Sequence, residues 1–254
     1  MVFPFEKVPH KVYKSSSLQS VFVTFWYDSL PDEAYNDAFY KRMEDFTLNK
    51  FALPVERRFP TNALQIWNNK NQTRLVFARD RVYALIDCDG YVSFDDSAFP
   101  QAYHLKDFLK DVIGINELKA MSIRKINIWR VGLEEGEQLN EDKIRQQIFS
   151  KEFLACNDKE EMSEQEKKML KEKFKWSDKE QTVWLRTAFL SVGETQRRYN
   201  MVMDSEAVSE QVRGIRLDDM ATVLRSLNNT LFDAFNWAVN PEIIIQMEKG
   251  LYTL

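Results

Sequence analysis

Residues 121–131 read MSIRKINIWRV and form the clearest strand in the sequence. Ile126 and Ile128 share one face of this strand with Arg124 and Arg130, because successive side chains of a strand point to opposite faces. The other face mixes apolar and polar side chains in the same way: Ile123, Lys125, Asn127, Trp129 and Val131. Neither face is purely apolar, so we expect a strand that is covered centrally on both sides and emerges at its ends.

The segment before this strand alternates between strands and helices. Residues 20–27 (SVFVTFWY) are apolar on both faces, as in a covered strand, and residues 28–46 repeat apolar side chains at helical spacing. Residues 62–86 alternate across two polar turns and predict a three-strand antiparallel meander. Residues 100–113 predict a second helix, which Gly114 ends as a C-cap glycine.

The segment after the strand is more highly charged. Residues 157–180 carry Ser163 and Glu166 as a capping-box pair and a thin apolar stripe that includes Phe174 and Trp176. We interpret this stretch as an exposed helix or a mobile, partly helical insertion. The other expected elements are a short helix at 140–149, a hairpin of 182–192 with 197–203, a connection at 208–215, and helices at 218–240 and 241–250.

This order of elements predicts an α+β fold, in which antiparallel sheets carry helices packed mainly on one face. We expect an N-terminal α+β lobe at residues 1–133 and a C-terminal lobe at 134–254, with the charged helical insertion, the hairpin and the long helix in the second. The lobes should pack closely, because no Gly-, Ser- or Pro-rich linker separates them. The two halves share only a loose hairpin-plus-helix theme, which does not establish a repeat.

Composition limits the classes of function. The net charge of −4 over 254 residues does not indicate a protein that coats nucleic acid, although a local basic face is compatible with it. Cys88 and Cys156 are far apart, which fits a reducing compartment without a disulfide framework. No run of 18 apolar residues and no secretory signal are present, so we expect a cytoplasmic protein with no membrane association.

Three stretches carry a resemblance to a known family: SVFVTFWYDSLPD, the order TRLVFARDRVYALID–YHLKDFLKDV–SIRKINIWRV, and the C-terminal LDDMATVLRSLNNTLFDAFNWAVNPEIIIQM. The chain resembles a sporadically distributed prokaryotic family of uncharacterised α+β proteins of about 250 residues, seen chiefly in bacteria. The resemblance covers most of the chain and implies no particular activity. The patchy distribution of that family implies a place in mobile-element or phage-defence loci.

Motifs for catalysis, metal binding or nucleotide phosphates are absent from the sequence. The two histidines, His10 and His104, favour structural roles, and Asp87 and Asp89 beside Gly90 favour a turn at a strand end over a magnesium site. Only seven glycines are present, too few for a Gly-rich phosphate loop. We therefore predict no catalytic residue, no metal ligand and no cofactor.

Basic and aromatic side chains in the expected strands are the best candidates for a binding surface. Guanidinium groups beside aromatic rings bind phosphate and stack on bases, but strand arginines also pair with carboxylates in ordinary salt bridges. The expected members of this face include Arg57, Arg58, Arg79, Arg81, Lys125 and Arg186 with Trp67, Trp184 and Tyr199. The predicted binding surface itself consists of Arg124, Asn127, Trp129, Arg130, Arg197 and Arg198.

Two classes of function follow. The preferred one is a non-enzymatic interaction or regulatory protein acting with a partner protein, because catalytic motifs are lacking while aromatic residues and an amphipathic C-terminal helix are plentiful. Residues 218–240 favour core packing, with a homodimer through the C-terminal helices as the alternative. The second class is a protein that binds nucleic acid or nucleotides on the Arg/Trp-lined face. A hydrolase that uses Asp87 and Asp89 ranks third.

Overall fold

The computed structural model describes the chain except for residues 1–2, 35, 52–55, 59–62, 69–72, 88–104, 134–136, 194–196 and 253–254. The chain forms two compact units. Unit 1 comprises Met1–Gln19, Arg124–Ala207 and Asn228–Leu254, and unit 2 comprises Ser20–Ile123 and Val208–Leu227. The units differ in their boundaries from the expected lobes, because β6 (Glu117–Gly132), β9 (Arg198–Arg216) and α6 (Met220–Ala238) each run from one unit into the other.

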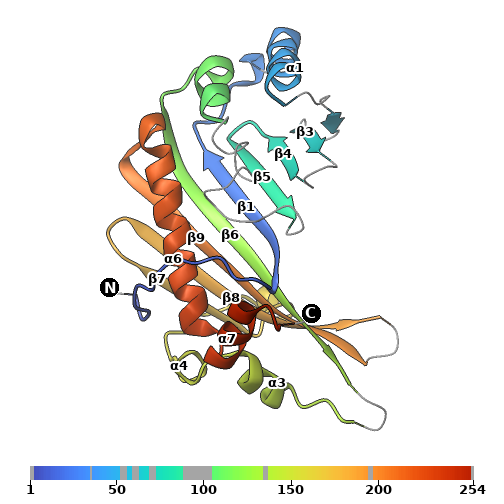
Figure 1. Ribbon diagram of the computed structural model, residues 1–254. Coiled ribbons are helices and arrows are strands. Elements are labelled where there is room, and N and C mark those ends of the chain that lie inside the picture. Colours follow the sequence, from blue (N-terminus) through green and yellow to red (C-terminus); the bar gives the residue numbers. More distant parts are fainter. Residues whose placement is uncertain are drawn as a thin grey trace. The chain divides into compact units, whose positions relative to one another are not determined.

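The remaining elements follow in chain order (Figure 1). The first half contains β1 (Leu18–Trp26), η1 (Asp32–Ala34), α1 (Asp37–Phe51), β2 (Glu56–Arg58), β3 (Ala63–Asn68), β4 (Thr73–Phe77), β5 (Arg81–Asp87) and η3 (Leu109–Ile113). The second half contains α3 (Glu141–Ile148), α4 (Lys151–Leu154), α5 (Glu164–Lys167), β7 (Glu172–Ser177), β8 (Gln181–Val192), η4 (Leu217–Asp219) and α7 (Pro241–Lys249).

The strands are hydrogen-bonded in the order β2-β3-β4-β5-β1-β6-β9-β8-β7. The pairs β1–β5, β2–β3, β3–β4, β4–β5 and β7–β8 are antiparallel. Helices accompany this antiparallel sheet, so the predicted α+β class is confirmed. No helix of the described residues is long and apolar enough to cross a membrane.

The strand order repeats one plan twice. In the first half, β1 is followed by α1 and by the meander β3-β4-β5, whose last strand pairs with β1. In the second half, β6 is followed by short helices and by the meander β7-β8-β9, whose last strand pairs with β6. The shared theme that the sequence shows only loosely is therefore a repeated topology.

In unit 2, β1 and β5 together present a buried apolar face. Val21, Val23 and Phe25 of β1 are each 0% exposed and pair with Ile86, Ala84 and Val82 of β5. Phe108, just before η3, packs at 4.6 Å between ring centroids on Phe77 of β4. Gly114 ends the η3 segment with a φ of 82°, so the predicted C-cap glycine is confirmed.

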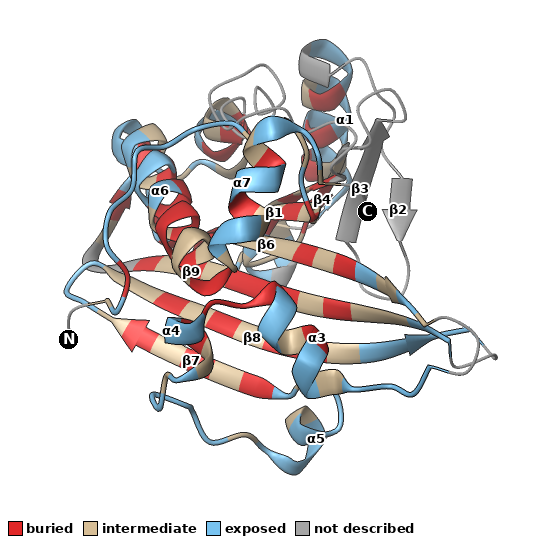
Figure 2. Cartoon of the chain, turned by 60° about the horizontal axis from the view of Figure 1, so that its bottom comes forward, coloured by how far each residue is buried: buried red, intermediate tan, exposed pale blue. Residues whose placement is uncertain are grey.

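In unit 1, helices α3, α4, α6 and α7 lie on one face of β6, β9, β8 and β7, and buried and less buried residues alternate along these strands (Figure 2). An aromatic core joins the two layers. Trp129 of β6 contacts Phe149 after α3 at 5.9 Å between ring centroids, and Trp176 of β7 contacts Trp237 of α6 at 5.6 Å. Helices therefore cover the inner face of this sheet, as predicted.

The expectation of a helical insertion at 157–180 is wrong for its second half. Residues 172–177 form β7, in which Phe174 and Trp176 are buried and the residues between them are half-buried. Only one helical turn, α5, is present, and it begins with the predicted capping box of Ser163 and Glu166. The connection expected at 208–215 is also wrong, because β9 continues to Arg216.

The long C-terminal helix packs into the core. Leu224, Leu227 and Leu231 of α6 are at most 1% exposed, which confirms core packing for this apolar stripe. Asn228, a polar residue in the middle of this helix, is 1% exposed. Its amide oxygen accepts a hydrogen bond of 2.7 Å from Nζ of Lys125 on β6, which explains how a polar side chain is tolerated there.

Candidate binding face of unit 1

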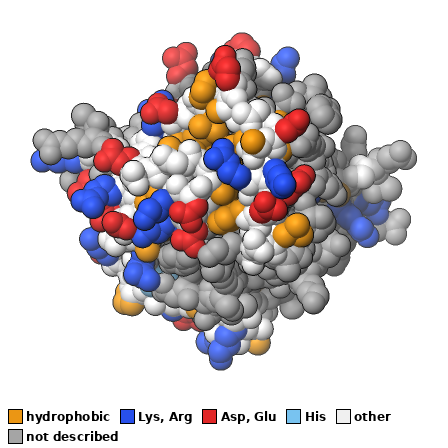
Figure 3. Space-filling model, turned by 90° about the horizontal axis from the view of Figure 1, so that it is seen from above, with side chains coloured by type: hydrophobic (Ala, Val, Ile, Leu, Met, Phe, Trp, Pro, Cys, Tyr) orange, Lys and Arg blue, Asp and Glu red, His pale blue; other side chains and the backbone are white. Residues whose placement is uncertain are grey.

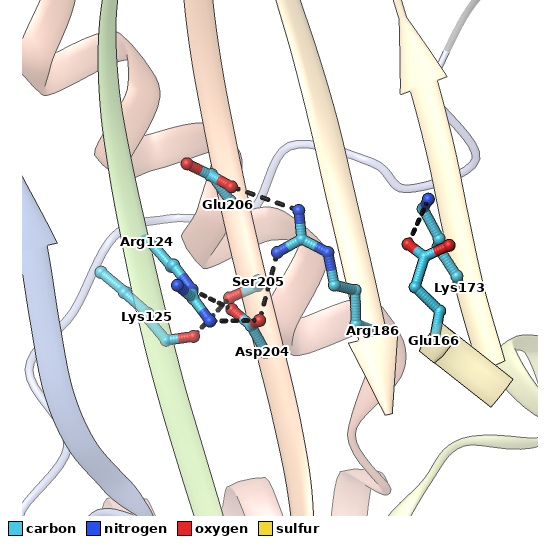
Figure 4. Close-up of polar contacts among 8 residues, drawn as sticks. All are labelled: Arg124, Lys125, Glu166, Lys173, Arg186, Asp204, Ser205 and Glu206. Carbon is cyan, nitrogen blue, oxygen red and sulfur yellow. Dashed lines mark hydrogen bonds and ion pairs between the residues drawn. The ribbon is translucent and has the colours of Figure 1, made fainter. Parts of the chain in front are cut away.

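The face of the unit 1 sheet opposite helices α3, α4, α6 and α7 is named here the open face, and Figure 4 shows Arg124, Lys173, Arg186, Asp204 and Glu206 among its side chains. Side chains at alternate positions of four strands point to it. Lys173 and Arg186 are cross-strand partners on β7 and β8, and so are Lys175 and Trp184. Ion pairs continue the row across β9 to Arg124 of β6. The open face comprises Lys173, Lys175, Trp184, Arg186, Leu190, Val192, Val202, Asp204, Glu206, Arg124, Ile126, Ile128 and Arg130.

The structure separates the residues of the predicted binding surface. Arg124 and Arg130 lie on the open face, but Asn127 and Trp129 point to the helix side of β6, where they are 3% and 2% exposed. Asn127 accepts a hydrogen bond of 3.2 Å from Ser17. These two residues belong to the core and share no surface with Arg124, because one position along a strand reverses the face.

The remaining two predicted residues, Arg197 and Arg198, are exposed at the start of β9. Arg198 is six residues before Asp204 on β9, so its side chain points to the same face. It extends the open face toward the end of the sheet. Nearby, Arg130 donates a hydrogen bond of 3.3 Å to Gln19. This end of the sheet is therefore basic and solvent-accessible.

A carboxylate network holds two arginines on the open face. Asp204 accepts two hydrogen bonds from Arg124, Nε to Oδ1 at 2.7 Å and Nη2 to Oδ2 at 2.8 Å (Figure 4). Arg186 donates to the same carboxylate at 3.1 Å and to Glu206 at 3.3 Å. The hydrogen bond to Asp204 raises the pKa of Arg124 above its usual value, so this guanidinium stays charged. These two arginines therefore form ordinary salt bridges, which the sequence analysis names as the alternative to phosphate binding.

A second group of cations surrounds Trp184. The Nζ atoms of Lys175 and Lys173 lie 4.6 and 5.1 Å from the centroid of the indole ring, and Cζ of Arg186 lies 5.6 Å from it. Distances of this size are typical of cation–π contacts. The sequence indicates Trp184 and Arg186 but misses the two lysines, because their segment reads as a helix. Their alternation with Phe174 is the signal that identifies them.

Glu166 of α5 reaches the edge of this group. Its carboxylate pairs with Lys173 at 2.8 Å. That hydrogen bond, followed by those from Ser163, lowers the pKa of Glu166 to about 2, so the carboxylate stays ionised at neutral pH. Lys175 has no ion pair within the described part of the chain.

Apolar side chains occupy the part of the open face between its two charged ends. Ile126, Ile128 and Val202 are half-buried, whereas Leu190 and Val192 are 46% and 39% exposed. These five residues are named here the apolar strip. The Trp184 cations and Arg124 lie at one end of it, and Arg130 and Arg198 lie at the other.

The other sequence candidates contribute no site in the described residues. Arg81 pairs with Asp80, and Arg79 donates a hydrogen bond to the carbonyl oxygen of Leu30, so both side chains make local contacts at turns. His10 contacts the buried Asn228. The remaining predictions concern side chains outside the described residues, those of Arg57, Arg58, Trp67, Asp87, Cys88, Asp89 and His104.

Metal-ligating side chains do not cluster in the described residues, where no group of three or more His, Cys, Asp or Glu could hold an ion. Charge is also mixed on the surface seen in Figure 3, where described basic and acidic side chains are interspersed. That view offers no competing region of a single sign.

Comparisons with known proteins add little. No family model and no curated protein matches the chain. Among solved structures, the chain is similar to Methanococcus jannaschii TBP, at 12% identity over 84% of this chain and 95% of that chain, with a TM-score of 0.25. A TM-score of 0.25 is too low to support a conclusion about the fold or function of this chain.

Proposed function

We propose that this chain is a non-enzymatic interaction protein that binds a partner protein on the open face of unit 1. The observation that carries the proposal is the apolar strip, because Leu190 and Val192 are exposed beside half-buried apolar residues on the sheet face opposite helices α3, α4, α6 and α7. Contiguous apolar surface rimmed by polar residues is typical of protein–protein contacts.

The dimensions of the strip suit one amphipathic helix. The six residue steps along β6 from Arg124 to Arg130 span about 20 Å, which about 13 helical residues match. Neighbouring strands lie about 4.8 Å apart, so three strands offer a width close to that of one helix. The basic residues at both ends favour a partner helix whose apolar stripe is flanked by carboxylates.

The test compares two aspartate substitutions at exposed apolar residues. Leu190→Asp places a charge in the strip, whereas Ile245→Asp changes a 47% exposed residue of α7 as the matched control. Wild type and both variants are purified from the native host, and the co-purifying protein is then expressed and titrated. We expect Leu190→Asp to weaken the purified complex at least thirtyfold, as for a central contact residue, and Ile245→Asp to leave it unchanged.

Two outcomes contradict the proposal. One is a complex that survives Leu190→Asp but is lost with Ile245→Asp. The other is a wild-type dimer, measured by light scattering, that Leu190→Asp converts to a monomer, because the occupant of the strip is then a second copy of the chain.

A further inference from the structure

Trp184 and its three neighbouring cations, Lys173, Lys175 and Arg186, are named here the Trp184 group. This group lies at one end of the open face and has a chemistry distinct from that of the apolar strip. It presents an aromatic ring with two ammonium groups and one guanidinium within 5.6 Å of the ring centroid. Trp184 is half-buried, so part of the indole is reachable from solvent.

The strands fix the position of each member. Lys175 lies directly across from Trp184, and Lys173 lies across from Arg186. Arg186 is held from the other side by Asp204 and Glu206. The ring and its cations are therefore arranged on a paired sheet before any ligand arrives, which reduces the entropy cost of binding.

The three cations around Trp184 differ in whether they already pair with a carboxylate. Arg186 contacts two carboxylates, and Lys173 contacts Glu166. Among the described residues, Lys175 has no ion pair, and its Nζ lies 4.6 Å from the centroid of the indole ring. A strongly hydrated ammonium gains little from an aromatic face alone at an exposed site, so a phosphate competes for it readily.

We infer that Trp184, Lys173, Lys175 and Arg186 bind nucleotide units, with a base stacked on the indole and its phosphate on the lysines. Stacking on an aromatic ring beside cations that follow a phosphate backbone is the usual chemistry of sequence-independent single-strand binding. A single strand and a free nucleotide both present this combination of base and phosphate. The inference does not depend on the partner protein, since no residue of the apolar strip takes part.

The experiment uses the full chain and three probes: fluorescein-labelled dT15, ATP as competitor, and inorganic polyphosphate, which has phosphates but no bases. Anisotropy is measured at 50 and 200 mM NaCl. Wild type should bind dT15 more tightly at 50 mM, because phosphate contacts release counterions. Displacement of dT15 by ATP at matched phosphate concentration identifies the free nucleotide as the ligand, and its absence identifies the strand.

The variants separate stacking from charge. Trp184→Ala should weaken dT15 about tenfold and leave polyphosphate unchanged, while Trp184→Phe keeps most of the binding and guards against a folding defect. Lys175→Ala should weaken both probes and reduce the salt slope for dT15 by about 0.7. Lys143→Ala, an exposed lysine of α3, should change neither.

The inference is overturned if wild type binds neither dT15 nor ATP at 50 mM NaCl. It is equally overturned if Trp184→Ala and Trp184→Phe bind dT15 as wild type does, or if Lys175→Ala and Lys143→Ala have the same effect.

Discussion

Asp204 is the central anion of the open face, because its carboxylate pairs with two guanidinium groups, those of Arg124 and Arg186. Its side chain is 12% exposed, and those of Arg124 and Arg186 are 40% and 20% exposed. The pairs are therefore screened in part by solvent and contribute less than a fully buried pair would. The hydrogen bonds are bidentate for Arg124, which fixes the direction of that side chain.

Asp204→Asn tests this role. The change removes the charge that both arginines share, and we expect the free energy of unfolding in urea to fall by about 2 kcal/mol. Glu161→Gln, an exposed carboxylate in a loop, is the control and should stay within about 0.5 kcal/mol of wild type. If the two variants had the same free energy of unfolding, the Asp204 network would make no contribution to the stability of the fold.

A buried carboxylate in α6 makes stability depend on pH. Burial raises the pKa of Asp233 above its usual value of 3.8, against the opposing hydrogen bond from the backbone N–H of Val8. The folded chain therefore keeps this proton to a higher pH than the unfolded chain does. The stability of the wild type should fall as the pH rises from 3.8 through the raised pKa of Asp233.

Asp233→Asn removes this titration and keeps an oxygen for Val8 at 2.9 Å. We predict that the variant melts at a higher temperature than wild type at pH 7, and that the difference vanishes near pH 3. Thermal unfolding at four pH values between these limits is the measurement. A variant that is less stable than wild type at pH 7 would mean that the ionised carboxylate stabilises the fold.

Among the elements, β7 determines the positions of two of the binding residues, Lys173 and Lys175. Phe174 and Trp176 stack at 5.6 Å on the covered side and direct Lys173 and Lys175 to the open face. The N–H of Glu160 donates to the carbonyl oxygen of Lys173 at 2.7 Å, so residues before α5 pair with the outer edge of this strand. Such a cover protects an edge strand from unwanted pairing.

Phe174→Ala should destabilise the chain by about 3–5 kcal/mol, because it opens a cavity at a residue that is 0% exposed. The control is Met169→Ala, five residues earlier in the same charged stretch and 55% exposed, which should change the free energy of unfolding by less than about 0.5 kcal/mol. If residues 172–177 were an exposed helix, both substitutions would have the same small effect in a urea titration.

Local signals in the sequence identify elements whose partners are near in the chain. The Gly114 cap, the Ser163 capping box and the alternation of residues 182–192 are all confirmed. The strand β7 is missed because lysines at every second position raise its charge, and six residues satisfy both the helical and the strand period. The length of β9 is missed because residues 204–213 (DSEAVSEQVR) are mostly polar and do not show the pattern of a covered strand.

At the scale of the whole molecule, the repeated strand order is a feature that sequence periodicity does not reveal. Each half places its first and last strands side by side, so the contacts that define the plan join distant residues. The same limit applies to the open face. The positions of Arg124 and Arg186 are readable from the sequence, but the partners Asp204 and Glu206 depend on which strands pair.

The central claim, that the open face of unit 1 binds a partner protein, can be tested without knowing the partner. A photo-crosslinking amino acid, p-benzoylphenylalanine, is placed at Leu190 in one variant and at Ile245 of α7 in another, and both are irradiated in the native host. We expect a discrete adduct of a second protein from position 190 and none from position 245. An adduct from 245 alone, or the absence of any adduct from 190, would contradict it.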